Sequence, residues 1–168
     1  MRKQIFYQYY VEGEDERSLV NALKTGLRCI EPGKVEKFNA VQNPFPFSMI
    51  RLLKYNTIVI LIYDTDVEYC DILRQNIAFL KRQKNIRDVL CIPQVRNLEE
   101  ELKYACNIKN IRELTHSDTE KDYKRDIISC SNLSARLLRC GFEKTKLWSR
   151  MPGNRFLEFG NDAAKIKK

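Results

Sequence analysis

The chain has 168 residues, of which 43% are hydrophobic and 31% are charged, and its net charge is +8 at pH 7. This composition excludes a disordered protein, and no apolar run approaches the roughly eighteen residues of a membrane span. The first residues lack a signal-peptide pattern, so we expect a cytoplasmic protein that has no membrane partner.

Two features of the composition narrow the possible chemistry. The six cysteines include no C-x-x-C pair and His116 is the single histidine, which argues against a zinc or redox site. Residues 101–168 hold fifteen Lys or Arg against nine Asp or Glu, whereas residues 1–100 are nearly balanced. A basic C-terminal part favours a polyanionic partner, most simply nucleic acid, although solubility alone is the alternative.

Strand and helix patterns alternate along the first two thirds of the chain. Residues 4–11, "QIFYQYYV", predict a buried strand, and a helix follows to about Lys24, with Gly26 as its stop. The later predictions, in order, are a strand over 34–41, a short helix over 48–55, a strand over 57–63, a helix over 69–84, a strand over 88–95, and a helix over 97–106 with Asn97 as N-cap. Residues 117–141 look helical, with Gly141 as the stop, and the basic, aromatic tail has no clear pattern.

This alternation predicts an α/β fold with a mainly parallel, four-stranded, Rossmann-like sheet flanked by helices. We expect residues 1–110 to form this core. Residues 111–168 are expected to form a mainly helical, basic extension packed on the same domain.

Carboxylates follow two of the apolar strands at the point where each ends. Glu12 ends the first strand, and Asp64 and Asp66 end the third. If these strands are neighbours, the three acids converge at the carboxyl edge of the sheet, where ligands bind in such folds. Their mutual repulsion would be relieved by Mg²⁺ or Mn²⁺, which prefers carboxylates together with water or phosphate oxygens. The alternative is that acids such as Glu14, Asp15 and Glu16 only complement a helix dipole.

The combination of "VEGEDE" and "YDTD" resembles the TOPRIM family, whose fold is shared by topoisomerases, primases, recombination mediators, OLD-family nucleases and small RNA-maturing nucleases. The resemblance covers about residues 4–107 and is closest to stand-alone OLD-like nucleases. It implies that Glu12, Asp64 and Asp66 are metal ligands, and Glu16 matches a further acid of many members. The chain departs from the family in having no glycine shortly after D-x-D, and it lacks the topoisomerase and primase modules.

OLD-like nucleases carry another glutamate after the next strand and a downstream lysine. In "VRNLEEEL" this implies Glu99 as a metal ligand or its supporting residue, although a helix start explains it equally and Glu100 and Glu101 are close by. Lys144 and Lys146 are the candidates for the lysine, and a surface role is the alternative for both.

The sequence therefore predicts an Mg²⁺- or Mn²⁺-dependent nuclease acting on DNA or RNA. Glu12, Asp64, Asp66 and Glu16 would bind metal, with Glu99 helping. The basic C-terminal residues would hold nucleic acid, and they are Lys144, Lys146, Trp148, Arg150 and Arg155. For Trp148 and the nearby Phe156 and Phe159, packing against the sheet is the alternative.

Two other functions remain open from the sequence. The first is a nucleic-acid-binding or regulatory component of a complex, without catalysis and with an ATPase encoded separately, because no phosphate-binding G-x-x-x-x-G-K-[ST] loop is present. The second is a receiver-type or phosphatase-like domain, since those also use D-x-D after an apolar strand. They place that motif on the first strand, which disfavours this function here.

Overall fold

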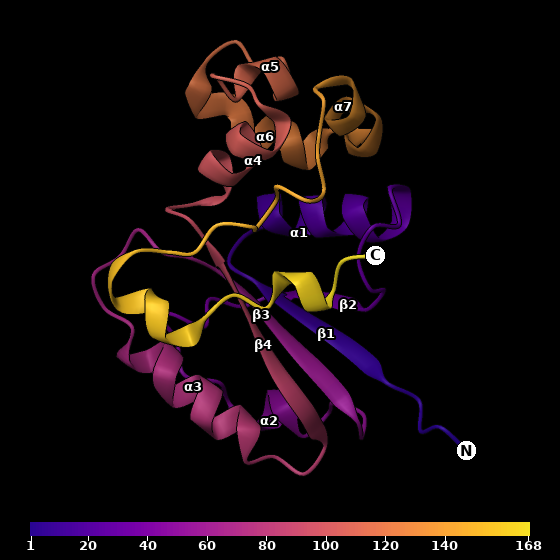
Figure 1. The fold of residues 1–168 in the computed structure, drawn as a ribbon, viewed down its shortest axis with the longest axis vertical. Helices are drawn as coiled ribbons and strands as arrows, with labels where there is room; N and C mark the ends of the chain where they lie inside the picture. The colour runs from indigo at the N-terminus through magenta and orange to yellow at the C-terminus, as the bar shows by residue number, and fades with distance from the viewer.

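A computed structural model describes residues 1–168, except for the side chain of Asn154. Its centre is a sheet with helices on both sides (Figure 1). The four strands are β1 (Phe6–Val11), β2 (Lys34–Lys37), β3 (Thr57–Asp64) and β4 (Ile86–Gln94). All are parallel and lie in the order β2-β1-β3-β4. The predicted α/β class with a four-stranded parallel sheet is confirmed.

The central pair of strands decides where the acids lie. β1 and β3 are direct neighbours, paired from Phe6 opposite Thr57 to Tyr10 opposite Leu61. β3 is apolar on both faces because both faces are covered, as is usual for a central parallel strand. Two strands that run side by side in the same direction end at the same edge of the sheet.

Helices cover the two faces of the sheet in separate layers. They are α1 (Glu14–Asn21), α2 (Phe47–Ile50), α3 (Asp71–Lys81), α4 (Leu98–Cys106), α5 (Arg112–Thr115), α6 (Tyr123–Ser129) and α7 (Leu133–Arg139). One π-helical turn is η1 (Ala22–Gly26). Three short 3₁₀ helices are η2 (Glu120–Asp122), η3 (Asn154–Phe159) and η4 (Ala163–Lys165). One buried cluster joins the sheet to α1, α4, α6 and α7, and a second joins it to α2 and α3. Among the described residues, no helix is long and apolar enough to cross a membrane.

Several predicted elements are shorter than their sequence patterns suggest. The strand predicted over 34–41 ends at Lys37, because the Asn39 side chain accepts from the backbone N–H groups of Val41 and Gln42 and forms a turn. The helix predicted over 48–55 is only α2, and the pattern over 117–141 is divided into η2, α6 and α7. The N-cap prediction is confirmed, since the Asn97 side chain accepts from Glu100 N over 3.0 Å.

The first helix changes geometry before the predicted stop. It is α-helical to Asn21 and then continues as the π-helical turn η1, which ends at Gly26. A Cβ at Gly26 would come within 1.8 Å of Oγ of Ser134 on α7. Glycine is therefore needed here so that α7 can approach the end of the first helix.

The C-terminal segment returns across the molecule and covers an open strand edge. Asp162 N donates to Cys91 O over 2.8 Å, and Cys91 N donates to Oδ2 of Asp162 over 2.9 Å. Further along, Glu31 N donates to Ile166 O, so the chain end reaches the loop before β2. Residues after 110 also contribute to both buried clusters. The extension is thus part of the buried cluster on each face of the sheet.

Candidate functional site

Two carboxylates meet at the carboxyl edge of the central strands. Glu12 directly follows β1, and Asp64 is the last residue of β3. Because β1 and β3 are parallel neighbours, both residues lie at the edge where ligands bind in open α/β sheets. The backbone N–H of Asp64 donates a hydrogen bond to Oε1 of Glu12 over 3.2 Å. The strand order alone therefore brings these two acids into contact.

The first turn of α1 adds two buried carboxyl groups to the half-buried Glu12 and Asp64. Asp15 and Glu16 are only 4% and 5% exposed. The Tyr123 hydroxyl donates to Oδ2 of Asp15 over 3.0 Å, whereas Oε2 of Glu16 is buried without a hydrogen-bond partner among the described residues. A Cβ at Gly13 would lie 2.8 Å from Oδ1 of Asp15 and 3.0 Å from Oε2 of Glu16. The glycine of "VEGEDE" thus leaves room for both acids.

Burial makes three acids of this site unusually weak. The pKa of Glu12 is raised to about 7, mainly by burial and also by the charges of Glu16 and Asp66, against the Asp64 N–H. The pKa of Asp64 is raised to about 8 by burial and then by Glu12. The pKa of Glu16 is raised to about 8 by burial and then by the adjacent Asp15 carboxyl. Near neutral pH these groups hold protons that a bound cation would displace.

None of the described lysines and arginines relieves this crowding of acids. In the described part of the chain, no Lys or Arg forms an ion pair with Glu12, Glu16, Asp64 or Asp66. Glu14, two residues after Glu12, does pair, and its partners are Arg17 and Lys37 at the surface. This cluster of acids therefore carries uncompensated negative charge as soon as the carboxyl groups lose their protons.

The donor types of this cluster fit a hard divalent cation. Mg²⁺ is commonly held by one or two carboxylates, with waters and substrate phosphates completing its ligands. Glu12, Asp64 and the unpartnered Oε2 of Glu16 are the groups that would hold it. Among the residues that the structure describes, no three or more His, Cys, Asp or Glu side chains are already arranged around one ion position. A cation here would need water or phosphate among its ligands.

The other two predicted acids lie at the rim of the site. Asp66 is exposed beyond the end of β3, and its charge contributes to the raised pKa values of Glu12 and Asp64. Glu99 is half-buried in the first turn of α4. The pKa of Tyr123 is raised by burial first, then by Asp15, and by Glu99 least. Neither rim acid forms a hydrogen bond to Glu12 or Asp64 among the described residues.

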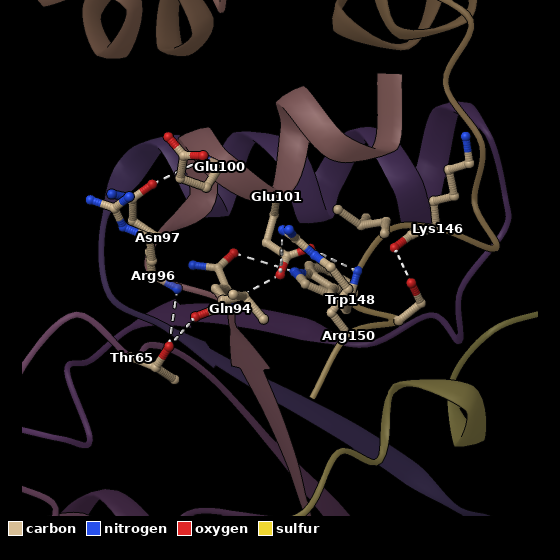
Figure 2. A network of polar contacts seen from close by, with 12 residues as sticks. Thr65, Gln94, Arg96, Asn97, Glu100, Glu101, Lys146, Trp148 and Arg150 are labelled. Atoms are coloured by element: carbon tan, nitrogen blue, oxygen red, sulfur yellow. Dashed lines mark hydrogen bonds and ion pairs between the residues drawn. The ribbon is translucent and has the colours of Figure 1, made fainter. Parts of the chain in front are cut away.

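A polar network connects the acids to the C-terminal segment. Nε2 of Gln94, the last residue of β4, donates to Oδ1 of Asp64 over 2.6 Å, and its Oε1 accepts from the Trp148 indole N–H over 3.3 Å. The fully buried carboxylate of Glu101 accepts from Val95 N over 2.8 Å and from Trp148 N over 3.2 Å (Figure 2). The C-terminal segment is thus fastened directly behind Asp64.

Sequence reasoning missed four residues of this arrangement. Asp15 was assigned to the helix dipole, yet it is buried against Tyr123. Gln94 carried a usable signal, because it is a polar residue at the end of an apolar strand, as Glu12 and Asp64 are. Glu101 and Tyr123 carried none, because Trp148 and Asp15, which they contact, come from segments far away in the chain.

The five basic or aromatic residues predicted to bind nucleic acid are spread over different surroundings. Trp148 is 1% exposed in the core, so the packing alternative describes it, and its ring is not a stacking surface for a base. Arg150 lies 3.6 Å from Glu101 and over the Tyr104 ring. Of the other three, Lys144 donates to Lys168 O, Lys146 pairs with Glu143 over 3.2 Å, and Arg155 donates to Glu68 O next to the D-x-D loop.

Comparison of this chain with protein-family models, curated proteins and solved structures found no match.

Proposed function

We propose that the protein is a metal-dependent nuclease with a TOPRIM-type acidic site that hydrolyses phosphodiester bonds of DNA or RNA. The observation that carries the proposal is the contact between Glu12 and Asp64 at the ends of β1 and β3, with Glu16 beside them and no cationic partner among the described residues. Buried acids without such a partner are best explained by a ligand that brings positive charge.

The residues have separable roles in this proposal. Glu12 and Asp64 offer oxygens to Mg²⁺ or Mn²⁺, which when bound supplies Lewis-acid activation and neutralises phosphate charge. Gln94 holds Oδ1 of Asp64 through its amide. Oε2 of Glu16, which no described residue donates to, is available to the cation or to the proton released by the attacking water.

The reaction in this proposal is an in-line hydrolysis. The water oxygen forms a bond to phosphorus, the bond from phosphorus to the leaving sugar oxygen breaks, and the leaving oxygen takes up a proton. Asp66 and Glu99 lie at the rim of the site, so in this proposal they would be on the side from which the substrate approaches. The basic character of residues 101–168 supports a nucleic-acid substrate.

The test is cleavage of labelled single-stranded and duplex DNA and RNA in Mg²⁺ and in Mn²⁺. We expect cleavage by the parent protein, and loss of at least a hundredfold in rate for Asp64→Asn. Asp88→Asn is the matched control, because this exposed aspartate lies near the start of β4, opposite Ile58 and away from the carboxyl ends of the strands. No cleavage by the parent on any substrate, or equal cleavage by the parent and Asp64→Asn, would refute the proposal.

The second candidate is a nucleic-acid-binding or regulatory component without catalysis, with an ATPase as a possible separate partner. It is favoured by one observation, that the described residues do not already form a three-ligand metal group. Binding to nucleic acid that is unchanged by chelator and by Asp64→Asn, without cleavage, would support this candidate instead.

A further inference from the structure

A pocket beside the acids gathers two arginines from distant segments. It is open, has a volume of ≈ 490 Å³, and lies just beyond the carboxyl end of β3. Its lining consists of Thr65, Asp66, Val67, Glu68, Arg96 and Arg155. The D-x-D loop forms one wall, while Arg96 comes from the turn between β4 and α4 and Arg155 from the C-terminal segment. Positive charge therefore stands next to the proposed cation site.

The backbone of Arg96 is held in an unfavourable conformation. Its φ is 67°, which lies in the left-handed region that residues other than Gly, Asn and Asp rarely adopt. Such strain persists where the surrounding structure fixes it, and it is concentrated at functional sites. A strained arginine beside an acidic site is therefore a reason to look for a ligand.

Thr65, the middle residue of "DTD", is what fixes this turn. Thr65 N donates to Arg96 O over 3.0 Å, and Arg96 N donates to Oγ1 of Thr65 over 3.0 Å. Oγ1 of Thr65 in turn donates to Gln94 O over 2.8 Å (Figure 2). The loop that carries Asp66 and the turn that carries Arg96 are thus joined by hydrogen bonds of Thr65.

The two guanidinium groups differ in how they are held. The Arg96 side chain is exposed and has no hydrogen bond or ion pair with the other described residues, and in Figure 2 its guanidinium points away from Gln94. Arg155 is also exposed, and Nη1 donates to the carbonyl of Glu68, which keeps it at the pocket wall. Arginine binds phosphate oxygens with two parallel N–H groups. One arginine is free to do so, and the other is already in place.

We propose that Arg96 and Arg155 form a phosphate-binding subsite for the nucleic-acid backbone, next to the phosphate that is cut. The inference rests on the proposed function, since it assigns a substrate contact to the same site. The subsite neutralises a phosphate beside Asp66 and Glu68, which would otherwise repel the strand. It also directs the strand along the carboxyl ends of β3 and β4.

The test is the salt dependence of binding to a fluorescein-labelled oligonucleotide, measured by anisotropy in EDTA. The logarithm of the association constant falls linearly with the logarithm of the salt concentration. Loss of one phosphate contact decreases the steepness of this slope by about 0.7 for a single strand and about 0.9 for a duplex. We expect this decrease for Arg96→Gln and restoration of the slope by Arg96→Lys, which keeps the charge. Arg82→Gln is the control, because Arg82 is an exposed arginine that follows α3, at the other end of the sheet.

The outcomes separate this inference from the proposed function. An unchanged slope for Arg96→Gln, a decrease equal to that of Arg82→Gln, or no binding by the parent would overturn the subsite. Cleavage by the parent in Mn²⁺ together with an unchanged slope would overturn the subsite but keep the nuclease. A decreased slope without cleavage would keep the subsite and refute the nuclease.

Discussion

Gln94 holds Asp64 at the centre of the candidate site, since its Nε2 donates to Oδ1 of Asp64 over 2.6 Å. Gln94 is fully buried, and its other amide atom, Oε1, accepts from the Trp148 indole N–H. The hydrogen bond favours the ionised form of Asp64 and so opposes the increase in its pKa that burial causes. A residue of the C-terminal segment thus fixes, through one amide, the orientation of an acid on the central strand.

Gln94→Leu should therefore weaken the site as well as the fold. We expect a loss of roughly 1–3 kcal/mol in the free energy of unfolding, because the Trp148 N–H is left buried without an acceptor. Affinity for Mn²⁺ should also fall, because the pKa of Asp64 rises further without its donor. Urea unfolding and Mn²⁺ titration measure the two effects. Gln83→Leu is the control, since the Gln83 side-chain amide donates to Phe79 O, at the other end of the sheet. Unchanged Mn²⁺ affinity in Gln94→Leu would show that this hydrogen bond does not support the site.

The raised pKa values predict that the metal-free protein loses stability as pH rises. Between the ordinary carboxyl pKa values of about 4 to 4.5 and the folded values of about 7 to 8, the folded state binds more protons than the unfolded state. The free energy of unfolding then falls with increasing pH across this range and levels off above about pH 8. Urea unfolding from pH 5 to pH 8 in EDTA measures the decrease.

Asp64→Asn and added Mn²⁺ should both reduce this pH dependence. The variant removes one of the acids that must ionise, and should be more stable than the parent at pH 8 by roughly 1–3 kcal/mol. The cation binds the ionised form, so it stabilises most at high pH. A parent protein whose stability in EDTA is constant or increases between pH 5 and pH 8 would contradict the described electrostatics.

Neighbouring glutamates of α4 should respond very differently to the same substitution. Glu101→Gln leaves Arg150 without its partner and puts an amide against two backbone N–H groups, so we expect a loss of roughly 2–4 kcal/mol. Glu100→Gln breaks only a surface pair with Lys103, at a cost of about 1 kcal/mol or less. Thermal and urea unfolding compare the two. Equal losses would mean that Glu101 is not the residue that anchors the C-terminal segment.

Gly13→Ala should disturb the acids more than the fold. Its backbone is extended, with φ −141°, so the expected effect is the contact of the new methyl group with Asp15 and Glu16 rather than backbone strain. We expect a loss of about 1 kcal/mol in the free energy of unfolding. Mn²⁺ affinity and cleavage rate should decrease by a larger fraction than the free energy of unfolding does. Gly153→Ala is the matched control, since a Cβ there meets nothing within 4 Å. The same decrease in both variants would count against a role for Gly13 in seating the carboxylates.

The sequence was informative where an apolar run ends in a polar residue. Glu12 and Asp64 follow runs that are buried on both sides, and parallel strand order then places them at one edge. The lengths of elements were harder to predict, since the turn made by Asn39 and the division of residues 117–141 depend on local side-chain hydrogen bonds and tertiary packing.

The rest of the site depends on contacts that no local pattern encodes. Trp148 looked like a residue for binding bases because it stands among lysines and arginines, yet it is buried behind Gln94. Arg96 attracted no attention in the sequence, because its place beside Asp66 comes from hydrogen bonds to Thr65, about thirty residues earlier. Both arrangements require the three-dimensional path of the chain.

The most direct measurement of the central claim is anomalous scattering from a crystal of the protein soaked in Mn²⁺ near pH 8. We expect a peak within bonding distance of carboxylate oxygens of Glu12 and Asp64, and its absence in Asp64→Asn crystals. A map without a peak there, in crystals where the two side chains still touch, would show that protons alone hold this cluster together.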